Sequence, residues 1–243
     1  MYDVRSAYEI LRNQINSFVN GLVPLMYDPY SPEHADAALL KEQLIEQSND
    51  FVQFLYHAVS QPTTGIDPLV EEEDGVALVQ FWYTVLNIKL HTALSQDELV
   101  HDGYQSQFVE ALQHAERAFT FIRRRGKKMT TSLLPTHDDM PYLFWIAWKC
   151  RDEKLRRQSA NLLRASNKMF RFESEGYWGI VIERVLEIEQ FPMIVPDSRR
   201  IYDLEVLPAD VGLNGRKQVL LTYTIGKRAV QGSPDWIQEY ISI

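Results

Sequence analysis

The sequence is poor in cysteine and in positive charge. Cys150 is the single cysteine, which excludes a disulfide framework and a cysteine-rich zinc module. The 33 acidic residues outnumber the 25 basic residues, and the formal net charge is -8. A protein that binds nucleic acid unaided needs a basic surface to displace counterions. This balance therefore argues against direct nucleic-acid binding.

Long hydrophobic runs are also missing. No stretch reaches the roughly eighteen apolar residues that a transmembrane helix needs. Asp3, Arg5 and Glu9 interrupt the first ten residues with charge, so this segment predicts neither a signal peptide nor a membrane anchor. We expect a soluble intracellular protein, cytoplasmic or nuclear, that does not act on a membrane.

Helical patterning dominates what the sequence does contain. Apolar residues recur at three- and four-residue steps through most of residues 1–196 and predict an all-α fold, an antiparallel bundle or array of about seven helices. Residues 76–94, VALVQFWYTVLNIKLHTAL, are apolar on nearly every side, which is typical of a helix at the centre of a protein. Ser95 and Glu98 then match a capping box before a helix that ends near Arg125.

After residue 196 the pattern changes to alternation. Residues 201–207 and 217–225 are rich in β-branched side chains and predict a β-hairpin, with Asn214-Gly215 as its turn. The final segment, SPDWIQEYI, predicts a closing turn or short helix, with Ser233 as its cap. We therefore divide the chain into a helical domain, 1–196, and a small β-hairpin appendage, 197–243, packed on the same domain.

One segment, Lys149-Cys150-Arg151-Asp152, could hold a reactive thiol among cations that lower its pKa. A catalytic cysteine needs a positioned histidine, however, and none is near in sequence. The favoured interpretation, by roughly five to one, is that Cys150 is a small core residue, because free cysteine is usually buried. Asp152 would then cap the next helix and pair with Arg156 at i+4.

The six histidines form no HxH, HExxH or HxxE pair, so the sequence predicts no metal site. No Gly-rich phosphate loop is present either, and we expect no cofactor. His91 lies on the most apolar helix, where a neutral, hydrogen-bonded core histidine is the default and a proton shuttle the alternative. His91, Lys89 and Tyr83 are the weak candidates for catalysis, while His137 beside two aspartates is more typical of a loop and cap.

Aromatic side chains gather in three of the predicted helices. Core packing explains most of them. Large rings that converge from several helices can still leave a concave apolar cavity, which is the usual form of a small-molecule site. The predicted ligand-binding set is Phe81, Trp82, Tyr142, Trp145, Trp148, Tyr177 and Trp178.

Residues 141–190 carry a family likeness. An aromatic helix runs into Lys-Cys-Arg-Asp, then come an Arg-Arg and a Leu-Leu pair, a Glu-Gly-x-Trp segment and a helix that ends in Glu-Ile-Glu. This order resembles the C-terminal regulatory region of fungal Zn₂Cys₆ (zinc binuclear cluster) transcription factors. The resemblance covers roughly the last two-thirds of the chain and is most specific around Lys149 to Arg157. The matching residues are Pro141, Lys149, Cys150, Arg151, Asp152, Arg156, Arg157, Leu162, Leu163, Glu175, Gly176, Trp178, Glu187, Ile188 and Glu189.

The resemblance implies a helical regulatory domain without the family's six-cysteine DNA reader. Such a chain is either part of a longer regulator or a stand-alone relative that has lost DNA binding. It implies a domain that binds a small hydrophobic metabolite or a partner protein in a regulatory role. The alternative is a cofactor-independent enzyme of fungal secondary metabolism, a cyclase or isomerase such as a Diels-Alderase, whose aromatic pocket preorganises its substrate. A third hypothesis is a structural module that forms a homodimer.

Overall fold

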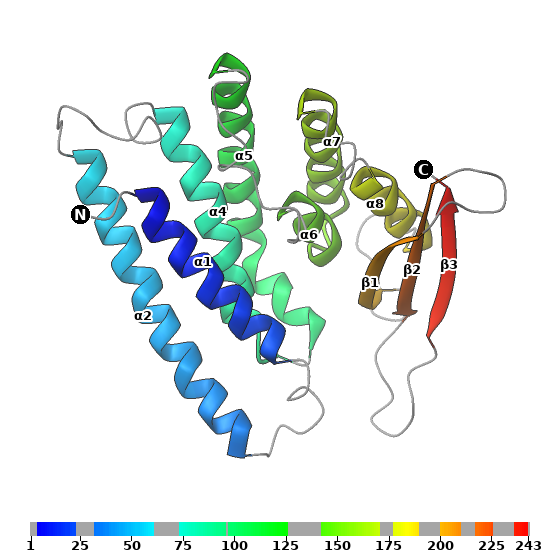
Figure 1. Cartoon of the computed structure of the whole chain (residues 1–243), viewed down its shortest axis with the longest axis horizontal. Helices are drawn as coiled ribbons and strands as arrows, with labels where there is room; N and C mark the ends of the chain where they lie inside the picture. Colours follow the sequence, from blue (N-terminus) through cyan, green and yellow to red (C-terminus); the bar gives the residue numbers. More distant parts are fainter. Residues whose placement is uncertain are drawn as a thin grey trace. The chain divides into compact units, whose positions relative to one another are not determined.

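The computed structural model describes residues 4–22, 32–60, 73–95, 97–125, 142–170, 177–189, 200–209, 217–225 and 236–242. In this part of the chain there are seven α-helices and one three-stranded antiparallel sheet (Figure 1). The predicted fold class, helical with a small C-terminal β-structure, is confirmed. The chain divides into two compact units, Met1–Leu133 and Leu134–Ile243. The domain division predicted from the sequence, 1–196 and 197–243, stays a prediction.

The first unit is an array of helices: α1 (Val4–Gly21), α2 (Pro32–Ser60), α4 (Glu73–Thr92), the 3₁₀-helix η2 (Glu98–Tyr104) and α5 (Gln105–Arg125). Figure 1 shows α1, α2, α4 and α5 running in alternating directions. Helix α4 contacts α1, α2, η2 and α5, so it lies at the centre of the array. The prediction that residues 76–94 form the central helix is confirmed.

The burial of α4 follows from its sequence. Apolar side chains point from it in every direction, and Val85, Leu86 and Leu90 are completely buried. Helix α1 has instead a single apolar stripe, from Val4 to Phe18 at three- and four-residue steps, and it buries this stripe. An all-round apolar helix needs neighbours on several sides, whereas an amphipathic helix needs one apolar surface.

The link between α4 and α5 differs from its prediction. The helical segment after Thr92 begins with η2, and its cap is Asp97, whose carboxylate accepts a hydrogen bond from the Leu99 N–H. Ser95 instead closes a local turn, in which its hydroxyl bonds both the N–H and the carbonyl of Asp97. The predicted capping box of Ser95 and Glu98 is therefore wrong, because the serine reaches the nearer backbone groups of the turn first.

The described residues of the second unit form three helices, α6 (Tyr142–Lys149), α7 (Glu153–Phe170) and α8 (Tyr177–Ile188), which contact one another. Every side chain of α6 is buried. Asp152 caps α7 by accepting a hydrogen bond from the Leu155 N–H at 3.0 Å, as its position before the helix predicts.

The sheet of the second unit has the order β1 (Ile201–Ala209), β2 (Gln218–Ile225) and β3 (Ile237–Ser242). The pairing of β1 with β2 confirms the predicted hairpin, whose Asn214-Gly215 turn lies outside the described residues. Strand β3 corrects the prediction of a closing helix for SPDWIQEYI. Pairing with β2 gives the backbone of Ile237–Ser242 its hydrogen bonds, and this tertiary contact outweighs the helix-cap signal before it.

Register divides the side chains of the sheet between two faces. On one face Leu221 lies opposite Glu239, and Glu239 receives hydrogen bonds from Arg184 of α8. This face is therefore the one next to α8. The other face includes Leu220 and Tyr240, which lie opposite each other. Among the described residues, no helix is long and apolar enough to cross a membrane.

The central position of α4 predicts an unequal response to the same substitution. Leu86→Ala should lower the free energy of unfolding by about 2–5 kcal/mol, because it leaves a cavity in a closed core. Leu39→Ala on α2, where the side chain is 62% exposed, should change it by less than about 0.5 kcal/mol. Urea unfolding followed by circular dichroism measures both values, and equal losses would contradict the central placement of α4.

Candidate functional site

The predicted ligand-binding residues fall in both units. Phe81 and Trp82 belong to α4 of the first unit. The other five, Tyr142, Trp145, Trp148, Tyr177 and Trp178, belong to α6 and α8 of the second unit. The prediction that all seven line one opening stays a prediction, and the chemistry of each unit is built from its own residues.

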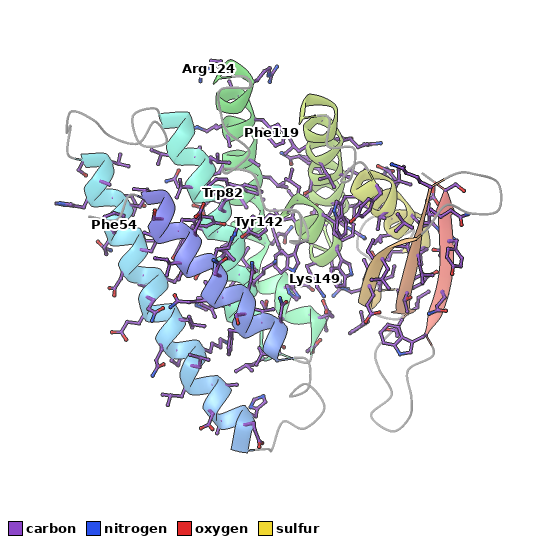
Figure 2. The ribbon with its side chains drawn as sticks, viewed as in Figure 1. Phe54, Trp82, Phe119, Arg124, Tyr142 and Lys149 are labelled. Atoms are coloured by element: carbon purple, nitrogen blue, oxygen red, sulfur yellow. The ribbon has the colours of Figure 1, made fainter. Side chains whose placement is uncertain are left out.

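In the first unit the rings of α4 pack against rings from α1 and α2. Trp82, labelled in Figure 2, stacks on Tyr8 with ring centres 4.9 Å apart and an interplanar angle of 23°. Tyr8 also contacts Phe51 at 6.2 Å, and Phe51 contacts Tyr83 at 6.1 Å. These four side chains form a continuous series of rings across three helices. Trp82 is buried in it, with Tyr8 against its ring, which is the arrangement of a packed core.

Tyr83 lies at the more accessible end of this series and carries a polar group there. Its side chain is partly buried, and burial raises the pKa of its phenol, an effect that the hydroxyl of Ser48 opposes in part. The charge of the Tyr56 phenolate on α2 would raise the pKa of Tyr83 further, and the Tyr56 side chain is 60% exposed. At neutral pH the Tyr83 hydroxyl is therefore a protonated hydrogen-bond donor beside apolar rings.

His91 and Lys89 occupy the last turn of α4, where the negative end of the helix dipole stabilises a positive charge. The His91 Nδ1–H donates to the carbonyl of Asn87 at 2.8 Å, so the predicted hydrogen bond of this histidine is confirmed. Lys41 of α2 donates to the His91 carbonyl at 2.7 Å, and burial lowers the pKa of this lysine. The Lys41 contact satisfies one of the carbonyls left without a partner at the end of α4, and the His91 ring is partly exposed.

In the second unit the aromatic side chains of α6 and α8 also contact one another. Phe144 meets Trp178 at 4.7 Å between ring centres, and Tyr177 meets Trp178 at 5.0 Å. The Trp148 Nε1–H donates to the carbonyl of Ile201 at 3.1 Å, which ties α6 to strand β1. A buried tryptophan needs such an acceptor for its N–H.

The residues at the two ends of α6, Tyr142 and Lys149, are labelled in Figure 2. The Lys149 ammonium lies 3.7 Å from the centre of a ring of its neighbour Trp148, a cation–π contact. Tyr142, Trp145 and Trp148 are all less than 10% exposed.

The strongest electrostatic feature of the second unit is a buried ion pair between α7 and the end of α8. The Arg156 guanidinium donates to Glu189 Oε2 and, through its Nε, to the Ala147 carbonyl at 2.8 Å. The other oxygen of Glu189 accepts the Ile201 N–H at 2.7 Å. Arg156 is 2% exposed and Glu189 is completely buried. This geometry corrects the prediction that Arg156 pairs with Asp152.

A second buried arginine extends this cluster. Arg200 precedes β1, is completely buried and donates through Nη2 to the carbonyls of Trp148 and Lys149 at the end of α6. Burial lowers the pKa of Arg156, and the positive charge of Arg200 lowers it further, while Glu189 opposes both. The cluster joins α6, α7, α8 and β1.

Sequence reasoning missed the charged cluster. One signal for Arg156 was present: it lies four residues before Ala160 and seven before Leu163, and so falls on the apolar face of α7. Glu189 carries a similar signal, because it lies four residues after Val185 and seven after Ile182 on the apolar face of α8. No comparable signal marks Arg200, which precedes β1.

Cys150 lies beside this cluster. Its side chain is 3% exposed, and burial raises the pKa of the thiol to about 11, which the positive charges of Arg156 and Arg200 lower only in part. The prediction that Cys150 is a small core residue is confirmed. A thiol with this pKa is protonated at neutral pH and is a poor nucleophile.

Metal binding has no support from the described residues, in which no three histidine, cysteine, aspartate or glutamate side chains form a group able to hold an ion. His137, Asp138 and Asp139 lie outside the described residues.

No protein-family model, curated protein or solved structure matches this chain. The resemblance to the regulatory region of fungal zinc binuclear cluster transcription factors therefore stays a prediction. The fold itself defines the class: a mostly helical protein with a small antiparallel sheet in its second unit.

The buried cluster predicts a large effect of removing its carboxylate. Glu189→Ala should lower the free energy of unfolding by about 3–5 kcal/mol, because it leaves the Arg156 charge buried without its counter-ion. The control is Glu153→Ala, which breaks the solvent-exposed pair between Glu153 and Arg157 and should cost less than about 1 kcal/mol. Urea unfolding measures both, and similar costs would show that Glu189 does not support the unit.

The burial of Cys150 predicts slow modification. At pH 8 a thiol with a pKa of 9.0 is about 10% ionised, and one with a pKa of about 11 is about 0.1% ionised. Ellman's reagent should therefore modify the folded chain at least about 100-fold more slowly than the chain in 6 M guanidinium chloride. Equal rates in the two states would contradict the buried, protonated thiol.

Proposed function

We propose that this chain is a binding domain of the transcription-factor-like kind, without its own DNA reader. It holds a small hydrophobic molecule or a partner protein in a regulatory role. The observation that carries the proposal is that the Cys150 thiol and the Nδ1 atom of His91 take part in the packing and hydrogen bonding of the fold. The Cys150 thiol is buried with a pKa of about 11, and the Nδ1 atom of His91 donates to the Asn87 carbonyl of its own helix. The buried thiol is poorly placed to act on a substrate, and one of the two ring nitrogens of His91 is held by a structural contact.

The edge of the ring series around Tyr83 is the part of the first unit best suited to an apolar ligand. The Tyr83 ring packs against the buried Phe51 ring and is itself partly exposed, and the Tyr83 hydroxyl is a donor that stays protonated at neutral pH. Apolar surface with one placed hydrogen-bond donor is the usual composition of a small-molecule site. Tyr56, exposed on the adjacent α2, gives a bound molecule or a partner protein a further aromatic contact.

The regulatory role is supported by charge and by the family likeness. A net charge of -8 disfavours direct contact with DNA, so any effect on transcription would pass through a ligand or through a second protein. The resemblance of residues 141–190 to fungal regulators supplies the transcription-factor-like part of the proposal.

The second candidate is the cofactor-independent cyclase or isomerase of fungal secondary metabolism. One observation favours it: the protonated, partly exposed Tyr83 phenol is a donor that could polarise a carbonyl of a substrate bound beside it. Rearrangements of this kind need neither a metal nor a strong nucleophile, so they are compatible with a buried Cys150.

Binding and catalysis predict different results for one experiment. The purified chain is incubated with a panel of apolar polyketides and terpenoids, and the mixtures are analysed by native mass spectrometry and chiral chromatography. We expect at least one metabolite to be retained and recovered unchanged. Tyr83→Phe should weaken its binding several-fold, because a neutral hydrogen bond contributes about 0.5–1.5 kcal/mol.

The matched control is Tyr56→Phe, which removes a phenol from an exposed position and should leave the affinity unchanged. A new product that the native chain forms and Tyr83→Phe does not form would replace the binding proposal with the enzyme. If no metabolite is retained, the small-molecule half of the proposal fails.

A further inference from the structure

The two outer strands of the sheet differ in how they are protected. Outer strands expose unpaired backbone groups, and proteins block them with charge, proline or a bulge. Strand β1 has all three: Glu205 is exposed, Pro208 has no backbone N–H, and the register shifts between Ile201 and Leu204. Strand β1 is therefore a poor template for a further strand.

Strand β3 has none of these devices. Its pairing with β2 runs from Ile237 to Ser242 without a register shift, and the strand contains neither proline nor lysine. Its single charged residue, Glu239, is neutralised within the chain by Arg184, at 2.9 Å from Nη2. Tyr240 is 65% exposed, the highest fraction among the large apolar side chains described. Among the described strands, β3 pairs on one side alone.

An apolar row leads to this open edge. Leu207 of β1 lies opposite Leu220 of β2, and Leu220 lies opposite Tyr240 of β3. The three side chains share the face of the sheet that points away from the Arg184–Glu239 contact. Leu207 at one end is 52% exposed, so the row is accessible as well as apolar.

We propose that the edge of β3 binds the β3 strand of a second copy of this chain, so that two three-stranded sheets join into one antiparallel six-stranded sheet. A second copy fits this edge because an antiparallel strand pair is its own complement under a two-fold axis. The edge carries no uncompensated charge that would repel an identical edge, although the chain as a whole is acidic.

The side chains of Glu239 and Tyr240 distinguish the two registers at the middle of β3. In an antiparallel pair, directly opposed residues have their side chains on the same face of the sheet. The two-fold axis must therefore pass between one residue of β3 and the same residue of the second copy. An axis at Glu239 would bring two carboxylates together, and like charges directly opposite are destabilising. An axis at Tyr240 brings two exposed phenol rings together, and aromatic cross-strand pairs are stabilising. It also places Gln238 opposite Ser242 of the second copy.

This register doubles the apolar row. Leu207, Leu220 and Tyr240 of one copy would continue into Tyr240, Leu220 and Leu207 of the other. The dimer is independent of the proposed function, whose ligand-binding surface lies at Tyr83 and Tyr56 of the first unit, so failure of one leaves the other standing.

Cysteine cross-linking tests both the dimer and its register. Tyr240→Cys places a thiol on the two-fold axis, where directly opposed Cβ atoms are about 4.5–5.5 Å apart, within reach of a disulfide after a small adjustment. Under mild oxidation with diamide, Tyr240→Cys should form covalent dimers at least about tenfold faster than the controls, because its partner is held at high effective concentration. The native Cys150 does not interfere, because it is buried.

Two controls match this variant. Tyr56→Cys replaces a tyrosine of similar exposure, 60%, on α2. Ser242→Cys lies on β3 itself. In the proposed register each Ser242 lies opposite Gln238 of the second copy, so the two introduced cysteines are four strand residues, about 13 Å, apart. Fast cross-linking of Ser242→Cys in place of Tyr240→Cys would overturn the register.

Sedimentation velocity on the unmodified chain tests the dimer without oxidation. We expect a concentration-dependent dimer that Tyr240→Lys abolishes, because lysine blocks an edge strand, and that Tyr56→Lys leaves intact. A monomer at all concentrations, with Tyr240→Cys cross-linking no faster than Tyr56→Cys, would overturn the proposal. The partner of the β3 edge would then be an extended segment of another protein in place of a second copy.

Discussion

A buried carboxylate that must be satisfied holds the second unit together. Glu189 is completely buried, and its two oxygens accept from Arg156 of α7 and from the backbone of Ile201 in β1. Removing an ion from water costs several kcal/mol, and this cost is offset only where the geometry of the partners is correct. The helices and the sheet are therefore confined to arrangements that bring these groups together. Arg200 adds a second link, from the start of β1 to the end of α6.

The first unit is organised by a different constraint. Its centre is the apolar helix α4, and the contacts that position it are those of packed rings such as Tyr8 on Trp82. Hydrophobic packing is not directional, so related sequences can repack such a core with small losses. A buried ion pair tolerates far less change. The core of the first unit therefore tolerates apolar substitutions, whereas the ion pair of the second unit requires particular residues.

This difference bears on function. The charged and nucleophilic groups of the second unit, Arg156, Glu189 and Cys150, support the fold, since each is buried and the two charges are bonded to scaffold groups. The tyrosines that are accessible to solvent include Tyr83 and Tyr56 in the first unit, and Tyr240 on the edge of the sheet. Aromatic side chains bind through large apolar surfaces with one polar end. The proposed binding function and the proposed dimer depend on these accessible tyrosines.

The sequence by itself determined the features that repeat over a few residues. The all-round apolar pattern of 76–94 predicted a central helix, alternation predicted the pairing of β1 with β2, and Asp152 before a helical pattern predicted a cap. Only the tertiary structure decided the partner of Arg156, which is Glu189, 33 residues away, and the strand conformation of Ile237–Ser242. The reason is physical: local periodicity reports which face of an element is apolar. The partner of a buried charge or of an open strand edge depends on segments that folding brings together from distant parts of the chain.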